Sequence, residues 1–199
     1  MNKNIYTLLV IGILLTSCHK EVMDRTVFIP DEYDRELPAY TEWGYNSFGA
    51  EYERDYFLVS NNIEPCKILY NNYQLQFSLH GTTHNGNMTL VFLFPTPDSS
   101  QMRDFKDLIL LNDKKIDLSD TNVCTVKMIL QDSNEIILDI PEGELYFKRT
   151  QLLRIDEKVN RVILSGTFDL HFMKGNFPSY ISNGRFDVGI TPKIFTVKN

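Results

Sequence analysis

Two long stretches of alternating apolar and polar residues near the C-terminal end constrain the fold more than any other feature. In residues 161–172 (RVILSGTFDLHF) and 179–190 (SYISNGRFDVGI), apolar side chains recur at alternate positions over most of the length. A period of two is typical of a β-strand with one buried face. The intervening Lys174-Gly-Asn-Phe-Pro-Ser179 has the composition of a turn, so the two stretches are predicted to form an antiparallel hairpin.

A short pattern occurs in both stretches, as Gly166-Thr-Phe-Asp-Leu170 and as Gly184-Arg-Phe-Asp-Val188. We expect Phe168 to pair with Phe186 and Asp169 with Arg185, because both pairs have the same sum of residue numbers, as an antiparallel register requires. The even-numbered apolar residues then face the core, and the charged pair lies on an exposed outer face.

The rest of the chain from Trp43 onward continues the β pattern, and its 199 residues suffice for one domain with a core. About ten strands joined by short turns predict an all-β fold, a single-domain antiparallel β-sandwich or flattened barrel covering residues 43–199. A closed lipocalin-like barrel is the alternative, since closure depends on strand shear rather than on sequence pattern. Residues 99–111 are predicted to form a short helical turn followed by a strand at Leu108–Leu111.

The first seventeen residues have the features of a lipoprotein signal peptide. Lys3 supplies a positive charge, and an uncharged, mostly apolar run from Ile5 to Leu15 is too short to span a membrane. Leu15-Thr-Ser-Cys18 resembles the bacterial lipobox, so Cys18 is predicted to be the lipidated first residue of the mature chain. Its diacylglyceryl group and its N-acyl chain supply the two lipid signals that stable anchoring needs. The expected location is the cell envelope, as an outer-membrane lipoprotein.

An acidic segment follows the lipobox, and residues 18–42 are predicted to be the lipidated cysteine and a solvated tether. Prolines at positions 30 and 38 interrupt any regular element, and apolar periodicity is absent. The whole chain has a net charge of −6, which argues against nucleic acid as a partner. The membrane link is therefore expected to be covalent rather than electrostatic.

No motif for catalysis, cofactor binding or metal binding is found. His80 and His84 lie on either side of a loop, but no spacing nominates a third ligand. His171 is predicted to lie in a strand on the outward face, without an orienting partner or a nucleophile. The prediction is therefore that the protein is not an enzyme and holds no cofactor or metal.

Cys66 and Cys124 remain after the lipidated cysteine is assigned. An exported protein lies where disulfides persist, so the two could be bonded. The alternative is a pair of buried free thiols that pack as small apolar residues.

An aromatic-rich stretch begins at Trp43. Trp43, Tyr45 and Tyr56 are candidates for stacking on a ligand such as a sugar ring. Aromatic residues at strand spacing also serve as core or edge packing, and this alternative stays open.

Three stretches resemble a group of uncharacterised lipoproteins from Bacteroidota: Asn46-Ser-Phe-Gly-Ala50, Ile163-Leu-Ser-Gly-Thr-Phe-Asp169 and Ile181-Ser-Asn-Gly-Arg-Phe-Asp-Val188. The resemblance implies an outer-membrane or surface lipoprotein with a β-rich domain. It implies no activity and no catalytic residues. His19-Lys20-Glu21 only partly matches the export signal of that phylum, so the chain faces either the periplasm or the surface.

The predicted function is therefore a non-enzymatic envelope lipoprotein whose domain binds a glycan or protein ligand. A structural or assembly component of the outer envelope is the alternative, and a glycan-directed hydrolase is a more distant one.

Overall fold

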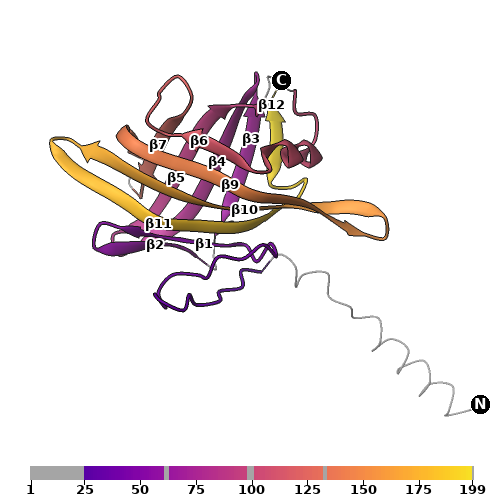
Figure 1. Ribbon diagram of the computed structural model, residues 1–199, viewed down its shortest axis with the longest axis horizontal. Helices are drawn as coiled ribbons and strands as arrows, with labels where there is room; N and C mark the ends of the chain where they lie inside the picture. Colours follow the sequence, from indigo (N-terminus) through magenta and orange to yellow (C-terminus); the bar gives the residue numbers. More distant parts are fainter. Residues whose placement is uncertain (1–24, 61–62, 98–100, 132–133, 199) are drawn as a thin grey trace, which may run out of the picture.

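The computed structural model describes residues 25–60, 63–97, 101–131 and 134–198, and most of their regular structure is β-strand (Figure 1). Twelve strands and one short 3-10 helix, η3, are formed in these residues. No helix in this part of the chain is both long and apolar enough to cross a membrane. The elements are β1 (Ser47–Tyr52), β2 (Asp55–Val59), β3 (Cys66–Asn71), β4 (Gln74–Thr83), β5 (Gly86–Pro95), η3 (Phe105–Leu111), β6 (Lys114–Asp117), β7 (Thr125–Leu130), β8 (Glu135–Ile137), β9 (Asp139–Ile155), β10 (Lys158–Lys174), β11 (Phe177–Ile190) and β12 (Phe195–Lys198).

One continuous hydrogen-bonded sheet contains all of these strands and curls into a half-barrel (Figure 1). Ten strands follow the order β6-β9-β10-β11-β1-β2-β4-β5-β7-β8, with antiparallel neighbours throughout, while β12 pairs in parallel with β3 beside β4. The predicted all-β, antiparallel fold is confirmed, and the flattened barrel describes it best. The barrel is not closed, because β6 and β8 end the path without pairing with each other.

Phenylalanine rings fill the inner face of the curled sheet. Phe77 of β4 lies at their centre, and its ring centroid is 5.1–6.0 Å from those of Phe92, Phe147 and Phe186. Phe92 lies on the neighbouring strand β5, whereas Phe147 of β9 and Phe186 of β11 are far from Phe77 in the chain, so their contacts hold the two sides of the half-barrel together. Burial of each ring contributes roughly 2–3 kcal/mol to folding. Residues Phe105, Leu108 and Leu111 of η3 join the same core, and η3 packs against β9 and β10.

In the C-terminal hairpin, the even-numbered apolar residues of β10 and those of β11 from Phe186 onward face the core as predicted, but the register differs by two residues. In the first half of β11 the predicted faces are wrong, because Ile181 is buried in the core and Tyr180 is exposed. Phe168 and Phe186 are both buried on the inner face, with ring centroids 6.5 Å apart. Phe168 pairs with Gly184 and Phe186 pairs with Gly166, so the predicted pairing of the two rings is wrong. Each ring lies over the glycine of the opposite strand, where a Cβ would come within 2.6 Å of a ring carbon. A phenylalanine needs that space, and only a glycine opposite provides it.

The predicted ion pair between Asp169 and Arg185 is not formed either. A β-bulge after Phe168 inserts Asn183, whose φ is 53°, and its backbone N–H donates to Asp169 Oδ1 at 2.8 Å. Arg185 instead donates from Nη1 to Asp31 Oδ2 at 2.7 Å. The arginine therefore ties the segment that precedes β1 to the sheet.

Residues 26–46, here called the N-terminal layer, are folded onto the outer face of the sheet. The backbone N–H of Val27 donates to the carbonyl of Tyr45 at 2.8 Å, and an antiparallel bridge joins Pro30 to Pro38. In a solvated spacer these backbone groups would form hydrogen bonds with water, whereas here they form them within the protein. The described part of the predicted tether is therefore a packed layer rather than a solvated spacer.

Packing between the N-terminal layer and the sheet is close. Leu37 is fully buried, and a Cβ on Gly49 of β1 would come within 2.4 Å of Pro38 Cδ. Gly49 points outward because its neighbours Phe48 and Ala50 face the core. The folded unit therefore begins well before Trp43, the first residue of the predicted domain.

Other local predictions have mixed outcomes. Strands β7 and β8 form a hairpin, and so do β9 and β10. The strand expected at Leu108–Leu111 is wrong, because these residues end η3, which Asp104 caps by accepting from the N–H of Lys106.

Candidate functional site

A buried carboxylate, Asp187 of β11, organises the N-terminal layer. Its side chain accepts hydrogen bonds from three consecutive backbone N–H groups, those of Trp43 (3.1 Å), Gly44 (2.7 Å) and Tyr45 (3.2 Å). The hydroxyl of Thr41 also donates to it, at 2.6 Å. Charge-assisted bonds of this kind are about twice as strong as neutral ones, so residues 41–45 are held in one conformation.

Side chains on the outward face of β10 and β11 form further hydrogen bonds with Asp187 and with residues 41–45. Ser165 is the cross-strand partner of Asp187 and donates from Oγ to its Oδ1 at 3.0 Å. Arg161 is buried nearby and donates from Nη1 to the carbonyl of Gly44 at 3.4 Å. Gly44 itself has a φ of 73°, which glycine adopts without strain. Asp187 thus fixes the backbone from which the Trp43 side chain projects.

Beside Asp187 lies a groove of about 500 Å³, here called the Trp43 groove. The N-terminal layer forms one side of it, and strands β9 and β10 form the other. The indole of Trp43 is 72% exposed there, although its backbone is firmly held. The lining residues are Tyr40, Thr41, Glu42, Trp43, Arg149, Gln151, Leu153 and Ile163.

Glu42 connects the polar groups of the Trp43 groove. Its Oε1 accepts from the hydroxyl of Tyr40 at 3.0 Å, and its Oε2 lies 3.4 Å from Nε of Arg149. The amide of Gln151 donates to the backbone carbonyl of Glu42 at 2.7 Å. Burial and the Glu42 carboxylate raise the pKa of Tyr40, so its hydroxyl stays protonated and donates. The ammonium of Lys148 lies 4.8 Å from the centre of the Tyr40 ring.

The Trp43 groove therefore combines one exposed aromatic face with a fixed set of donors and acceptors. An indole offers a flat apolar surface on which the C–H face of a ring can stack. The guanidinium of Arg149 and the carboxylate of Glu42 offer planar, directional hydrogen bonding at its side. A flat molecule with an apolar face and a polar rim matches this combination.

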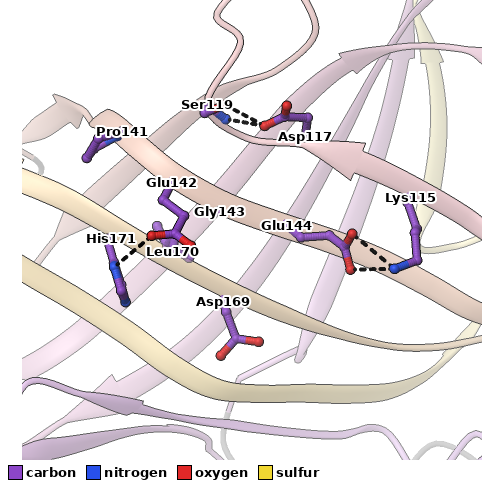
Figure 2. A pocket seen from close by; sticks show the side chains of 10 residues that line it. All are labelled: Lys115, Asp117, Ser119, Pro141, Glu142, Gly143, Glu144, Asp169, Leu170 and His171. Carbon is purple, nitrogen blue, oxygen red and sulfur yellow. Dashed lines mark hydrogen bonds and ion pairs between the residues drawn. The ribbon is translucent and has the colours of Figure 1, made fainter.

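A second groove, here called the His171 groove, lies on the outer face of β6, β9 and β10 (Figure 2). Its volume is about 580 Å³. Cross-strand pairing places Glu142 opposite His171 and Glu144 opposite Asp169. The lining residues are Lys115, Asp117, Ser119, Pro141, Glu142, Gly143, Glu144, Asp169, Leu170 and His171.

Two carboxylates of the His171 groove lie beside basic side chains. Glu144 accepts from Lys115 at 3.1 Å, and Nδ1 of His171 lies 3.6 Å from Oε2 of Glu142. Figure 2 shows the carboxylates of Asp169 and Glu144 directed away from each other. Partial burial raises the pKa of Asp169, and the N–H of Asn183 opposes that rise. His171 therefore has an acidic neighbour in Glu142, contrary to the prediction that it lies without an orienting partner.

The three predicted stacking aromatics do not lie together. Trp43 lines the groove, whereas Tyr45 is half-buried and outside its lining. Tyr56 donates its hydroxyl to Asp34 at 3.1 Å and is half-buried. Sequence reasoning missed Tyr40, because it lies in the segment that was interpreted as a tether. It also missed Arg149 and Gln151, which lie near Trp43 only because of the fold. The available sequence signal is that these two residues alternate with Thr150, which places both on the same face of a strand.

Cys66 and Cys124 are both buried and not bonded to each other. Cys66 lies in β3 and Cys124 just precedes β7, with β4 and β5 between them. Three strand spacings of about 4.8 Å exceed the reach of a disulfide, so the alternative of two free buried thiols is correct. The predicted lipidation site, Cys18, lies outside the described residues.

The histidines considered as metal ligands do not form a metal site. His84 is exposed in the turn between β4 and β5, and its backbone N–H donates to Asp55 at 2.6 Å. His80 lies on β4, where burial lowers the pKa of its imidazole. In the part of the chain that the structure describes, no three His, Cys, Asp or Glu side chains are grouped so as to hold a metal ion.

Comparison of the chain with models of protein families, with curated proteins and with solved structures finds no match.

Proposed function

We propose that this protein is a non-catalytic lipoprotein of the bacterial envelope, anchored through Cys18, that binds a saccharide in the Trp43 groove. The observation that carries the proposal is the exposed indole of Trp43 on a backbone clamped by Asp187. Because the backbone of Trp43 is already fixed and its indole is exposed, stacking of a ligand on the indole costs little conformational entropy.

The polar side of the groove supports a saccharide as the ligand class. Sugar rings have an apolar C–H face and hydroxyls around the rim, which suit an indole beside directional donors and acceptors. Glu42 and Arg149 already lie 3.4 Å apart, so a pair of neighbouring hydroxyls can bridge them without a change of conformation. A protein ligand would need a larger surface than this groove provides.

The hydrogen bonds and positions of the titratable side chains support binding without turnover. Glu42 is occupied by Tyr40 and Arg149 within the groove. His171, the histidine predicted to lie outward on a strand, does so and lies beside Glu142 in the other groove. General acid–base chemistry on a sugar needs two carboxyl groups on either side of one bond, and the Trp43 groove is lined by one.

The groove is tested by tryptophan fluorescence, since Trp43 is the sole tryptophan of the chain. Titration with a panel of envelope and dietary polysaccharide fragments is expected to shift its emission with saturation for at least one fragment. Arg149→Ala leaves the indole in place as reporter, and we expect it to weaken binding about tenfold or more by removing a charged donor. Phe177→Ala, at an aromatic side chain that is 76% exposed elsewhere, is the matched control and leaves the affinity unchanged.

Absence of a saturable shift across the panel would contradict the saccharide ligand. Release of new reducing ends from a bound fragment would instead favour the glycan-directed hydrolase.

The anchor is tested separately by metabolic labelling with radioactive palmitate. Wild-type protein is expected to take up label and Cys18→Ala to take up none, and equal labelling of the two would exclude Cys18 as the lipidated residue.

A further inference from the structure

Three consecutive apolar residues at the start of the described chain lie open to solvent. Val27, Phe28 and Ile29 are 40–42% exposed. In an extended chain, successive side chains point to opposite sides, so a segment lying flat on the protein would bury every second one. Here all three keep about two fifths of their surface exposed, so neither side of the segment is fully covered by the rest of the molecule.

This strip is nevertheless held in place. The N–H of Val27 donates to the carbonyl of Tyr45 at 2.8 Å, and the carbonyl of Ile29 accepts from the N–H of Ala39 at 2.7 Å. Both partners belong to the N-terminal layer that Asp187 clamps to the sheet. The exposed side chains are therefore part of a fixed surface rather than of a frayed end.

An exposed tyrosine follows four residues after this strip in the same N-terminal layer. Tyr33 is 93% exposed, while its backbone N–H donates to Asp31 Oδ1 at 3.0 Å. Asp31 is in turn paired with Arg185 of β11. Tyr33 thus projects from an anchored turn, as an aromatic side chain does at a lipid–water interface.

The length of chain before this surface limits where it can lie. Nine residue steps separate Cys18 from Val27, and a fully extended chain of that length spans at most roughly 30 Å. A protein anchored through Cys18 therefore keeps the strip within that distance of the lipid headgroups. The opposite end of the same short segment is a diacylated cysteine in the bilayer.

We propose that Val27, Phe28, Ile29 and Tyr33 rest on the bilayer that holds the Cys18 anchor, so that the domain is docked on the membrane. This inference rests on the lipid anchor of the proposed function, but not on the saccharide site. Docking restricts the anchored domain to one orientation, with the N-terminal layer between the lipid and the sheet.

Charge indicates which lipid surface this is. Residues 25–42 contain five acidic and two basic residues, and Glu32 and Glu36 are exposed beside Tyr33. Such a segment is repelled by anionic headgroups. The partner is therefore a zwitterionic bilayer surface, contacted through apolar and aromatic side chains.

The test uses the chain from Cys18 to Asn199, which contains every described residue, coupled through Cys18 to maleimide lipids in phosphatidylcholine vesicles. Coupling is selective because Cys66 and Cys124 are buried, and it places the anchor independently of cellular lipidation. Two single-tryptophan proteins are compared in vesicles with brominated acyl chains: F28W and F177W, each in a W43F background.

The F28W indole is expected to lose roughly half of its emission to the brominated lipid, as an interfacial aromatic would. The F177W indole, on a more exposed site at the tip of the β10–β11 hairpin, is expected to lose none. Replacing part of the phosphatidylcholine by phosphatidylglycerol is expected to reduce the quenching of F28W. An unquenched F28W, equal quenching of both proteins, or stronger quenching with phosphatidylglycerol would each overturn the proposal. Failure of saccharide binding leaves these outcomes unchanged, so the two proposals fail separately.

Discussion

Phe168 of β10 lies directly opposite Gly184 of β11, and its ring covers the space where a side chain at Gly184 would project. Phe186 and Gly166 repeat the arrangement two residues along the same hairpin. The two rings therefore sit diagonally, 6.5 Å apart between centroids, rather than face to face across the strands. This packing sets the register on which the positions of Asp187 and Asn183 depend.

We expect Gly184→Ala to lower the free energy of unfolding by about 1–3 kcal/mol. The added Cβ would approach the Phe168 carbonyl oxygen to 2.3 Å, and backbone atoms cannot move aside as a flexible side chain can. Phe168→Ala is expected to cost about 3–5 kcal/mol by leaving a cavity. Urea unfolding measures both, with the exposed Phe177→Ala as a control that changes stability by less than about 0.5 kcal/mol. A neutral Gly184→Ala would contradict the packing described.

Asp187→Asn is expected to lower the free energy of unfolding by about 2–4 kcal/mol and to loosen residues 41–45. Both carboxylate oxygens accept from backbone N–H groups, Oδ1 from Gly44 and Oδ2 from Trp43. Either placement of an amide therefore sets its NH₂ group against a backbone donor. Hydrogen exchange at residues 41–45 should accelerate more than exchange in the core strands. Unchanged exchange in these residues would mean that Asp187 does not hold the layer.

Asp169→Asn serves as the contrasting substitution. Asp169 uses one oxygen to accept from Asn183, a bond that an amide oxygen can also make. Because partial burial raises the pKa of Asp169, the folded state holds its proton more tightly than the unfolded state does. The ionised carboxylate is then a cost to folding above its pKa, and the cost disappears as the pH falls below the ordinary value of 3.8. We expect Asp169→Asn to be slightly more stable than wild type at pH 7 and to lose that advantage toward pH 3, as thermal unfolding at several pH values would show.

Cys66 and Cys124 are expected to be unreactive in the folded protein. Burial raises the pKa of the Cys66 thiol well above its usual value and that of Cys124 to about 12, so neither is a thiolate at pH 8. Ellman's reagent should detect neither thiol in native protein and both after denaturation in guanidinium. A reductant should leave the melting temperature unchanged, whereas a drop on reduction would indicate a disulfide between them.

Alternation along single strands correctly predicted the β class, the C-terminal hairpin, and the core-facing residues of β10 and of β11 from Phe186 onward. Burial on one face of a strand is a local property with a period of two, so it can be read from consecutive residues. The register of Phe168 and Phe186 could not be predicted in the same way. It depends on which residue the opposite strand presents to each ring and on the bulge at Asn183.

The N-terminal layer and the Trp43 groove were determined only by the tertiary structure. The acidic, proline-containing segment has the composition of a spacer, and its burial depends on Asp187 and Arg185, about 150 residues further along the chain. Trp43 was recognised as a candidate from its type alone, whereas Tyr40 and Arg149 join it only because β9 passes beside the layer. The pattern within one segment indicates which of its residues are buried and which are exposed. A site between two segments forms only when long-range hydrogen bonds bring the segments together, and these bonds do not show in the pattern of either segment.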